Sequence, residues 1–375
     1  MACEDKRHLN PISDKAISGM VSRWLTARGY RRGSLALGRK LILKDWKYRN
    51  EIPMRFAIAA YRQGFSALLL KNLRAADIEP SSCMPDLWYA KAHPINGQFG
   101  IWIDDKLTLK YMLRPFDELL PKYFLYLDQG GGTHALMDCP SSVSPDADGV
   151  VSLLRERKRL VLKKVSGSYS AGFHRLDFVG NEFMLDGRHI AKSELTALLS
   201  SLRKYLVTEH LVAHPLISRW YPQSANIIRL VVSNCDGQSP HLFAAYIRIG
   251  QARTGVVELA DWGGLFASVG LSDGKIDRGL QFEGAGFKRC DVHPDSGETI
   301  DGYVPHWDEI LVAIREIGLY LPNLRYVGWD VIVEQSGFRF IEGNSWPGIG
   351  FIQMFYPFLS DSAAAELFGP YCERP

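Results

Sequence analysis

The feature that most constrains the fold is an apolar hairpin near the C-terminus. Residues 327–344 contain two strand-like runs separated by a short turn around Ser336. If the hairpin turns about Ser336, Asp330 lies directly opposite Glu342, and Asn344 follows two residues later on the same face. A turn of two residues would instead shift the pairing by one residue and break this alignment. The register of the hairpin therefore decides whether the two acids meet.

The two acids of this hairpin point to a cation. Two carboxylates held opposite each other repel, and the arrangement becomes favourable when a divalent cation lies between them. Asp, Glu and Asn side chains supply oxygen ligands, which Mg²⁺ prefers. The pattern therefore predicts a magnesium site made by Asp330, Glu342 and Asn344. A solvent-exposed hairpin face with two incidental acids would give the same pattern.

A second candidate element lies earlier in the chain. Lys163 ends a short apolar run, and a loop of Ser, Gly and other small residues follows at 166–172. A lysine charge and exposed backbone N–H groups suit a phosphate that Mg²⁺ also binds. A plain surface turn is the alternative interpretation. Neither this loop nor residues 270–275 have the spacing of a Walker A loop, so a P-loop NTPase is not expected.

The rest of the chain indicates a mixed fold. Residues 13–75 have mostly the apolar spacing of helices, whereas strand-like runs dominate from residue 159 onward. Strands and helices do not alternate with the strict spacing of a doubly wound parallel sheet. We therefore expect an α+β or mixed α/β protein, and 375 residues are enough for two or three domains.

Charge is distributed unevenly along the chain. Residues 1–75 contain 16 Lys and Arg against five Asp and Glu, a net charge of +11, whereas the remainder carries −8. Because these charges interleave with apolar helical positions, we expect a packed N-terminal region with a basic outer face rather than a nucleic-acid-binding arm.

Several classes of protein are not expected. The six cysteines show no CxxC spacing, no apolar run approaches the ~18 residues of a membrane span, and the first residues do not resemble a secretory signal. These features predict a cytoplasmic protein. GxSxG and HExxH motifs are also absent from the sequence, which argues against a serine hydrolase or a zinc protease.

The order of motifs resembles the ATP-grasp superfamily, and more narrowly the sugar-transfer-associated ATP-grasp proteins, over roughly residues 100–360. The general resemblance is carried by Asp105-Lys106, Lys163 with its loop, Asn226-Ile227-Ile228-Arg229, Gly328-Trp329-Asp330 and Ile341-Glu342-Gly343-Asn344. The narrower resemblance is carried by Arg248, Asp261-Trp262-Gly263-Gly264, the turn from His293 to Gly297, and Asn344-Ser345-Trp346-Pro347-Gly348.

This resemblance implies an α+β protein with the ATP-grasp fold, in which a lid subdomain and a C-terminal α+β subdomain follow a mainly helical N-terminal region. We expect the helical domain at residues 1–103, the linker helix and lid at 104–206, and the catalytic subdomain at 207–375.

The resemblance also implies the ligands of the site. ATP and one or two Mg²⁺ ions are the expected cofactors, with the metal held by Asp330, Glu342 and Asn344. Phosphate contacts are expected from Lys106, from Lys163 in preference to Lys164, and from Ser166, Gly167 and Ser168 of a loop that folds over the phosphates. Adenine contacts are expected from Glu209, His210 and Leu211.

Three residues are expected to act on the reacting groups. By the resemblance Arg229 stabilises the transferring phosphoryl group and Asn226 lies beside it, although a salt-bridged strand arginine would look the same. Arg248 is expected to shape the substrate pocket together with Asp261, or to pair with it. His293 is interpreted as part of a capped turn rather than as a general base.

The implied function is an ATP- and Mg²⁺-dependent ligase that activates a carboxylate as an acylphosphate and couples it to an amine. The alternatives are a phosphotransferase that acts on a hydroxyl and a silent nucleotide-binding module. Expected partners are a small carboxylate and an amino acid or peptide amine, with an anionic acceptor or carrier protein at the basic N-terminal region. No nucleic acid and no membrane span are expected.

Overall fold

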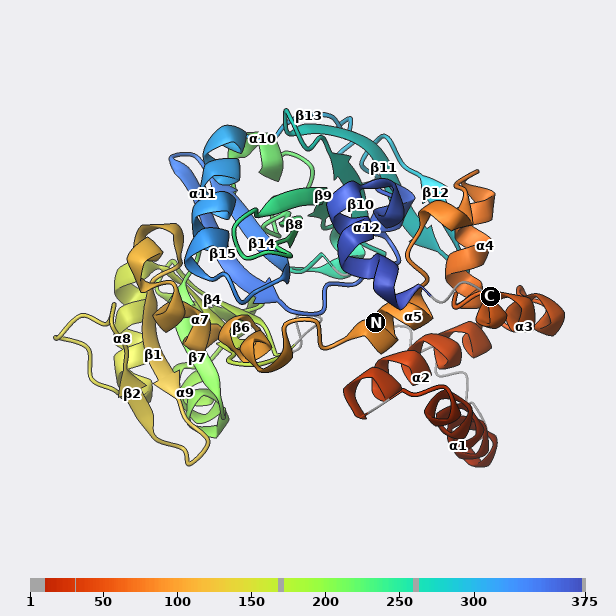
Figure 1. The fold of residues 1–375 in the computed structure, drawn as a ribbon. Coiled ribbons are helices and arrows are strands. Elements are labelled where there is room, and N and C mark those ends of the chain that lie inside the picture. Colours follow the sequence, from red (N-terminus) through yellow and green to blue (C-terminus); the bar gives the residue numbers. More distant parts are fainter. Residues whose placement is uncertain (1–10, 31, 168–171, 259–262, 373–375) are drawn as a thin grey trace. The chain divides into compact units, whose positions relative to one another are not determined.

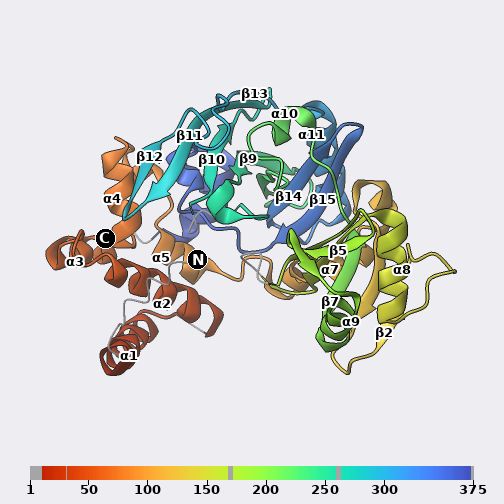
Figure 2. The same cartoon turned by 180° about the vertical axis from the view of Figure 1, so that it is seen from behind.

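The computed structural model describes residues 11–30, 32–167, 172–258 and 263–372 (Figures 1 and 2). The chain forms two compact units. One contains the N-terminal residues to Gly97, the short segment Glu283–Phe287 and the C-terminal residues from Gly348, and the other contains Gln98–Phe282 and Lys288–Pro347. No helix in the described ranges is both long and apolar enough to cross a membrane. The boundaries expected at 103/104 and 206/207 stay predictions.

The first unit is helical, as the sequence predicts. A small core of Leu25, Tyr30, Ile42, Leu87 and Ala90 joins its first, second and fifth α-helices. Its α-helices are α1 (Pro11–Ala27), α2 (Arg32–Lys47), α3 (Met54–Arg62), α4 (Ala67–Ala75), α5 (Asp86–Ala92) and α12 (Ser362–Phe368). Its short 3-10 turns include η1 (Pro80–Ser82), η6 (Ile352–Met354), η7 (Phe358–Ser360) and η8 (Gly369–Tyr371).

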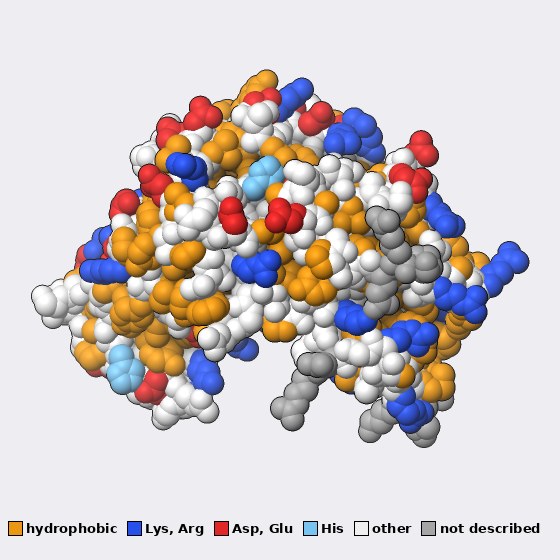
Figure 3. All heavy atoms as spheres, in the orientation of Figure 1, with side chains coloured by type: hydrophobic (Ala, Val, Ile, Leu, Met, Phe, Trp, Pro, Cys, Tyr) orange, Lys and Arg blue, Asp and Glu red, His pale blue; other side chains and the backbone are white. Residues whose placement is uncertain are grey.

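The outer face of these helices is basic. Exposed cations lie on the first three helices, among them Arg23, Arg39, Lys40, Lys47 and Arg55. The space-filling view shows many Lys and Arg side chains over this part of the molecule (Figure 3). The basic outer face expected from the charge count is therefore present, and Leu25, Ile42, Ala57 and Ala60 are buried between the charges.

Three side chains cap the start of α4. Ser66 is the N-cap residue, and its hydroxyl accepts a hydrogen bond from Leu69 N. Asp45 accepts from Ala67 N at 2.7 Å and from Leu68 N at 2.9 Å. Asp86 accepts from both Ser66 N and Ser66 Oγ at 2.5 Å. Donors that would otherwise be orphaned at the helix N-terminus are thus satisfied in the core of the unit.

The second unit contains a smaller sheet with strand order β2-β1-β7-β3-β4-β5-β6, whose described pairings are antiparallel. Apolar side chains of two helices, α8 (Ala147–Arg157) and α9 (Lys192–Ser201), pack against it. Its strands are β1 (Tyr123–Leu127), β2 (Thr133–Ala135), β3 (Arg159–Lys164), β4 (His174–Val179), β5 (Glu182–Leu185), β6 (Arg188–Ile190) and β7 (Tyr205–Glu209). β7 is an inner strand of this sheet and lies between β1 and β3.

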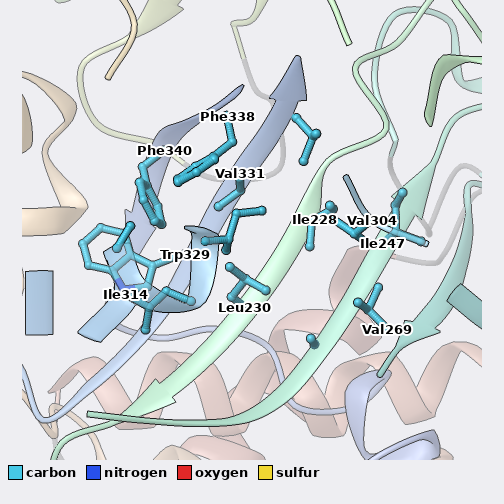
Figure 4. Close-up of a cluster of buried hydrophobic side chains, with 14 of the residues drawn as sticks. Ile228, Leu230, Ile247, Val269, Val304, Ile314, Trp329, Val331, Phe338 and Phe340 are labelled. Carbon is cyan, nitrogen blue, oxygen red and sulfur yellow. The ribbon is translucent and has the colours of Figure 1, made fainter. Parts of the chain in front are cut away.

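The larger sheet has the order β12-β11-β10-β9-β8-β14-β15, and β13 pairs with β11. Its core packs against α11 (Trp307–Tyr320), and Figure 4 shows side chains from β8, β9, β10, β14, β15 and α11 meeting there. The strands are β8 (Ile228–Ser233), β9 (His241–Ile249), β10 (Leu265–Val269), β11 (Lys275–Glu283), β12 (Gly286–Arg289), β13 (Gly302–Tyr303), β14 (Tyr326–Glu334) and β15 (Gly337–Asn344). The connections include η2 (Gly97–Gly100), α6 (Ile101–Asp104), α7 (Lys106–Met112), η3 (Arg114–Leu119), α10 (Pro215–Ser218) and η4 (Ala252–Thr254). The predicted α+β class is confirmed.

The β14–β15 hairpin pairs Asp330 with Glu342, but its turn and strand pairing differ from those expected. Its turn has only two residues, because Glu334 pairs with Gly337. This turn alone would put the acids out of line. A bulge at Ile341 inserts one extra residue into β15 and restores the alignment. The acids therefore meet because a bulge compensates the short turn.

The capped start of α4 makes stability depend on pH. Burial raises the pKa of Asp86 to about 7 and that of Asp45 to about 6, whereas in an unfolded chain both ionise near pH 4. Between these values the folded state binds protons that the unfolded state has released, so the free energy of unfolding falls as pH rises from about 4 to about 7.

Chemical denaturation at several pH values measures this slope. Asp86→Asn and Asp45→Asn should each flatten it, because Asn does not titrate. A parent protein whose stability rises steadily across the same range, or variants that keep the parent slope, would contradict the assignment.

Candidate active site

The middle of the larger sheet holds a buried carboxylate between two guanidinium groups. Asp330 on β14 lies opposite Arg229 on β8, whose Nε bonds to Oδ1 and whose Nη2 lies 3.0 Å from Oδ2. Arg248 Nη2 on β9 donates to the same Oδ2 at 2.8 Å. Burial by itself raises the pKa of Asp330, but the two guanidinium charges hold it below its usual value. Asp330 is therefore ionised, and both of its oxygens accept hydrogen bonds.

The other two predicted metal ligands each keep an oxygen available. Glu342 Oε1 accepts from Lys106 Nζ at 3.1 Å. Asn344 Nδ2 donates to Gly328 O at 3.2 Å, so its Oδ1 faces away from that carbonyl. Among the residues that the structure describes, none donates a hydrogen bond to Glu342 Oε2 or Asn344 Oδ1. Both side chains are half-buried, so these oxygens can take a ligand.

The described ranges contain no group of three or more His, Cys, Asp and Glu side chains that could hold a metal ion. The three predicted metal ligands of this hairpin are two carboxylates and the amide of Asn344. One of the carboxylates, Asp330, is already paired with two arginines. The candidate ligands are therefore Glu342 and Asn344, which lie two residues apart on one strand, with Asp330 contributing only through lone pairs that the arginines leave unused.

The junction of α6 and α7, formed by Asp104, Asp105 and Lys106, connects the hairpin to the loop that follows β3. Asp104 accepts from Ser345 N at 2.8 Å and also from Ser345 Oγ. Asp105 is the N-cap of α7, and its Oδ2 accepts from Ser166 Oγ at 2.9 Å. Lys106 then makes the ion pair described above. The segment thus holds both the end of β15 and the first residue of the small-residue loop.

Lys163 lies near the same group of charges without an acidic partner of its own. Its ammonium lies 4.9 Å from the centre of the Tyr123 ring, and no carboxylate of a described residue lies within ion-pairing distance. Burial, followed by the charges of Lys106 and Lys110, lowers the pKa of Lys163 to about 7, although two nearby glutamates offset part of this. Lys164 is exposed. Between the two lysines, Lys163 is the one that faces the site.

Lys110, a fully buried lysine, lies near Lys163. Lys110 Nζ pairs with Asp117 at 2.7 Å and with Asp138 at 3.1 Å, and donates to Pro121 O at 2.9 Å. Its charge is therefore compensated within the protein. Removing one partner of such a buried network costs more than removing a surface ion pair, because the remaining charge is left without water.

The segment expected to contact adenine follows the end of β7. The Glu209 carboxylate accepts a hydrogen bond from Lys122 N at 2.6 Å, which ties it to the start of β1. His210 is half-buried, and its Nδ1 has no hydrogen-bond partner among the described residues. Burial, reinforced by two nearby arginines, lowers the pKa of His210 to about 4, so the ring is neutral near pH 7. Leu211 is half-buried next to it.

Of the predicted loop contacts, Ser166 and Gly167 are exposed, whereas Ser168 lies outside the described residues. Asp261 lies outside them as well. A pairing between Asp261 and Arg248 therefore stays a prediction. The Arg248 side chain is 24% exposed, against 9% for Arg229, and its Nε is buried without a hydrogen-bond partner in the described part of the chain. Arg248 is thus the more accessible of the two arginines.

Asn226 lies just before β8, the strand that carries Arg229, and bonds to the surrounding backbone. Its Nδ2 donates to Ile217 O at 2.9 Å and Tyr221 O at 3.2 Å, and its Oδ1 accepts from Ser224 Oγ and Gly250 N, each at 3.0 Å. The side chain is buried, and its hydrogen-bonding capacity is used by its own surroundings. This arrangement fits a positioning role more closely than contact with a reactant.

The structure places His293 in a capped turn. The ring is fully buried, Nε2 lies 2.8 Å from Gly250 O, and Nδ1 lies 3.3 Å from the backbone nitrogens of Asp295 and Ser296. A neutral ring with Nε2 protonated satisfies all of these contacts, because Nδ1 then accepts. The interpretation as a turn residue is confirmed.

Three supporting residues were missed from the sequence. Lys110 follows Lys106 by four residues on a short helix, which is typical of a solvated basic face. Tyr123 begins an apolar strand and resembles an ordinary core residue. Asp104 makes its hydrogen bonds to a residue 241 positions away. The only available signal was the charged run at residues 104–106, of which the sequence interpretation used the last two.

Sequence comparison identifies the family of the chain. The family model described as sugar-transfer associated ATP-grasp matches residues 100–358, well over half of the chain. The chain belongs to this family. Its matched region contains the Asp104–Lys106 segment, both sheets and the hairpin of Asp330 and Glu342.

Solved structures similar to this ATP-grasp chain have low sequence identity to it. They include D-alanyl-alanine synthetase A from Vibrio cholerae O1 biovar eltor str. N16961, with 12% identity over 72% of this chain and 64% of that chain, and a TM-score of 0.40. The ATP-grasp ligase PsnB complexed with minimal precursor has 12% identity over 72% and 60%, and a TM-score of 0.36. The chain thus spans less than two thirds of the length of either. No curated protein sequence matches it.

The buried carboxylate yields a prediction about stability. Asp330→Asn removes the charge that compensates two arginines, one of them buried, and should lower the free energy of unfolding by about 3–5 kcal/mol. Asp291→Asn is the matched control, because that carboxylate pairs with Arg289 at the surface and its loss should cost less than about 1 kcal/mol. Denaturant titrations measure both. If Asp330→Asn is as stable as the parent, the carboxylate does not brace the sheet.

Proposed function

We propose that this ATP-grasp protein is an ATP- and Mg²⁺-dependent ligase that couples a carboxylate to an amine and releases ADP and phosphate. The observation that carries the proposal is the juxtaposition of lysine charge with oxygen ligands. Lys163 has no acidic partner in the described part of the chain, and the charge of Glu342 acts on it. Glu342 and Asn344, two residues apart on β15, each keep an oxygen available. Such a pairing suits a polyphosphate and its cation.

The proposed nucleotide contacts follow from this placement. Lys106 and Lys163 would bind phosphate oxygens, with Ser166, Gly167 and Ser168 supplying loop contacts. The segment of Glu209, His210 and Leu211 would lie against adenine. Because Asp105 holds Ser166 on the N-terminus of α7, the loop begins from a fixed point.

Mg²⁺ fits the oxygen donors of the hairpin. Glu342 and Asn344 would hold it, and Asp330 would add a further oxygen while remaining bonded to its arginines. The ion would neutralise phosphate charge when bound. Arg248 is the better candidate for contact with the reacting carboxylate or phosphoryl group, because Arg229 is more buried and spends two donors on Asp330.

The proposed reaction has two balanced steps. A substrate carboxylate oxygen attacks the terminal phosphorus of ATP, and the bond to ADP breaks, so that ADP leaves with the electron pair and an acylphosphate forms. An amine nitrogen then attacks the acyl carbon, phosphate leaves, and the nitrogen loses a proton. Arg248 would stabilise negative charge at the phosphoryl oxygens in the first step. Suitable acceptors are amino acid or peptide amines, and the basic face of α1–α3 would suit an anionic acceptor or carrier protein.

Trapping with hydroxylamine tests the reaction class. The protein, Mg-ATP, a library of carboxylic acids and hydroxylamine should yield a hydroxamate together with ADP and free phosphate. Glu342→Gln should lower the rate at least tenfold, whereas Glu316→Gln, an exposed change on α11, should leave it unaltered. A stable phosphoester seen by phosphorus NMR would indicate a kinase instead. Nucleotide binding without any ADP release across the library would indicate a binding module.

Lys163 predicts a pH dependence of nucleotide binding. Without nucleotide its pKa lies at about 7, so it is charged below that pH and neutral above it. A bound phosphate favours the charged form, so binding takes up a proton, and affinity should fall by up to tenfold per pH unit above pH 7. Lys163→Met should remove this slope after the titration of ATP itself is subtracted. Calorimetry in buffers of different ionisation enthalpy measures the proton count, and equal slopes in the two proteins would contradict the assignment.

A further inference from the structure

Two lysine ammonium groups lie close to the Tyr123 ring. Lys163 Nζ is 4.9 Å from the ring centre and Lys110 Nζ is 5.5 Å from it. Tyr123 is 2% exposed, and burial raises the pKa of its phenol, so the ring is neutral at physiological pH. The two lysines differ in one respect: Lys110 has carboxylate partners, whereas Lys163 has none among the described residues.

The position of the ring is fixed from several sides. Tyr123 N donates to Asp138 Oδ2 at 2.7 Å, and the same carboxylate pairs with Lys110. Tyr123 also pairs with Thr208 of β7 and packs in a small cluster with Val165 and Leu206. Asp138 therefore joins the start of β1 to Lys110, the second lysine close to the ring.

The charged groups that act on Lys163 come from three elements. Lys106 and Lys110 of α7 repel its charge, and Glu342 of β15 and Glu209 of β7 attract it. The two attracting carboxylates are already engaged, one with Lys106 and the other with a backbone amide. Within the described residues, the direct contact of the Lys163 ammonium is thus the Tyr123 ring.

We propose that Tyr123 is a positioning residue whose ring face holds the Lys163 ammonium toward the nucleotide phosphates without neutralising its charge. This inference rests on the proposed function for the role of Lys163. A carboxylate in the same place would compete with phosphate for the ammonium N–H groups. The negative face of an aromatic ring attracts the cation through its quadrupole and leaves the N–H groups available. Lys110, which is held by its two carboxylate partners, also contacts the ring and helps to fix its position.

The test compares ring variants of the full chain with two readouts. The first is the rate at which an amine-reactive reagent labels Lys163 at pH 7 without nucleotide, read by mass spectrometry. The second is the affinity for Mg-ADP. Tyr123→Leu removes the ring face, so Lys163 should lose its proton more readily, label about three- to tenfold faster, and bind Mg-ADP about three- to thirtyfold more weakly. Tyr123→Phe keeps the face and should stay within about twofold of the parent in both.

Fluorinated phenylalanines at position 123 separate the ring electrostatics from folding. They preserve the shape of Phe while successive fluorines weaken the negative face, so the labelling rate should rise with the number of fluorines. A rate independent of fluorination, or Leu and Phe variants that behave alike, would overturn the proposal.

The two readouts separate this inference from the proposed function. If Lys163→Met binds Mg-ADP as tightly as the parent, Lys163 is not a phosphate ligand and the proposed nucleotide contact fails. That result also overturns the stated role of Tyr123 toward phosphate. If Lys163→Met weakens binding but neither readout responds to the ring variants, the nucleotide contact survives and only the inference about Tyr123 fails.

Discussion

The paired charges of Asp330, Arg229 and Arg248 are the interaction on which the larger sheet depends. They lie on three adjacent strands, β14, β8 and β9, and Asp330 and Arg229 are buried there. An unpaired charge there would be costly, so the three strands must keep their mutual register. Because β15 pairs with β14, this register also helps to fix the positions of Glu342 and Asn344 on β15.

The bulge at Ile341 turns this framework into a candidate site. A two-residue turn is a compact way to close the hairpin, but by itself it would place Glu342 out of line with Asp330. The extra residue restores the alignment, and the Asp104–Lys106 segment then holds the strand end through Ser345 and Glu342. The Glu342 carboxylate thus pairs with Lys106 and its charge acts on Lys163, while the charge of Asp330 stays with its arginines.

The sequence was sufficient to predict the parts of the molecule that depend on local pattern. The helical N-terminal region and the apolar hairpin follow from spacing, and the pairing of Asp330 with Glu342 is confirmed. The reason for that pairing was wrong, because a bulge leaves no clear mark on an apolar strand. The choice of Lys163 over Lys164 as a phosphate contact stays a prediction. Lys110 and Tyr123 were not predictable, since their partners become neighbours only when α7, β1 and β3 pack together.

The central claim is that Glu342 and Asn344 hold the cation while Asp330 continues to brace the sheet. Anomalous diffraction from crystals grown with Mn²⁺ and a non-hydrolysable ATP analogue tests it most directly. The account predicts a manganese peak in contact with oxygens of Glu342 and Asn344, with Arg229 still bonded to Asp330. A peak that contacts neither residue, or an Asp330 side chain released from Arg229 to bind the metal, would contradict the account.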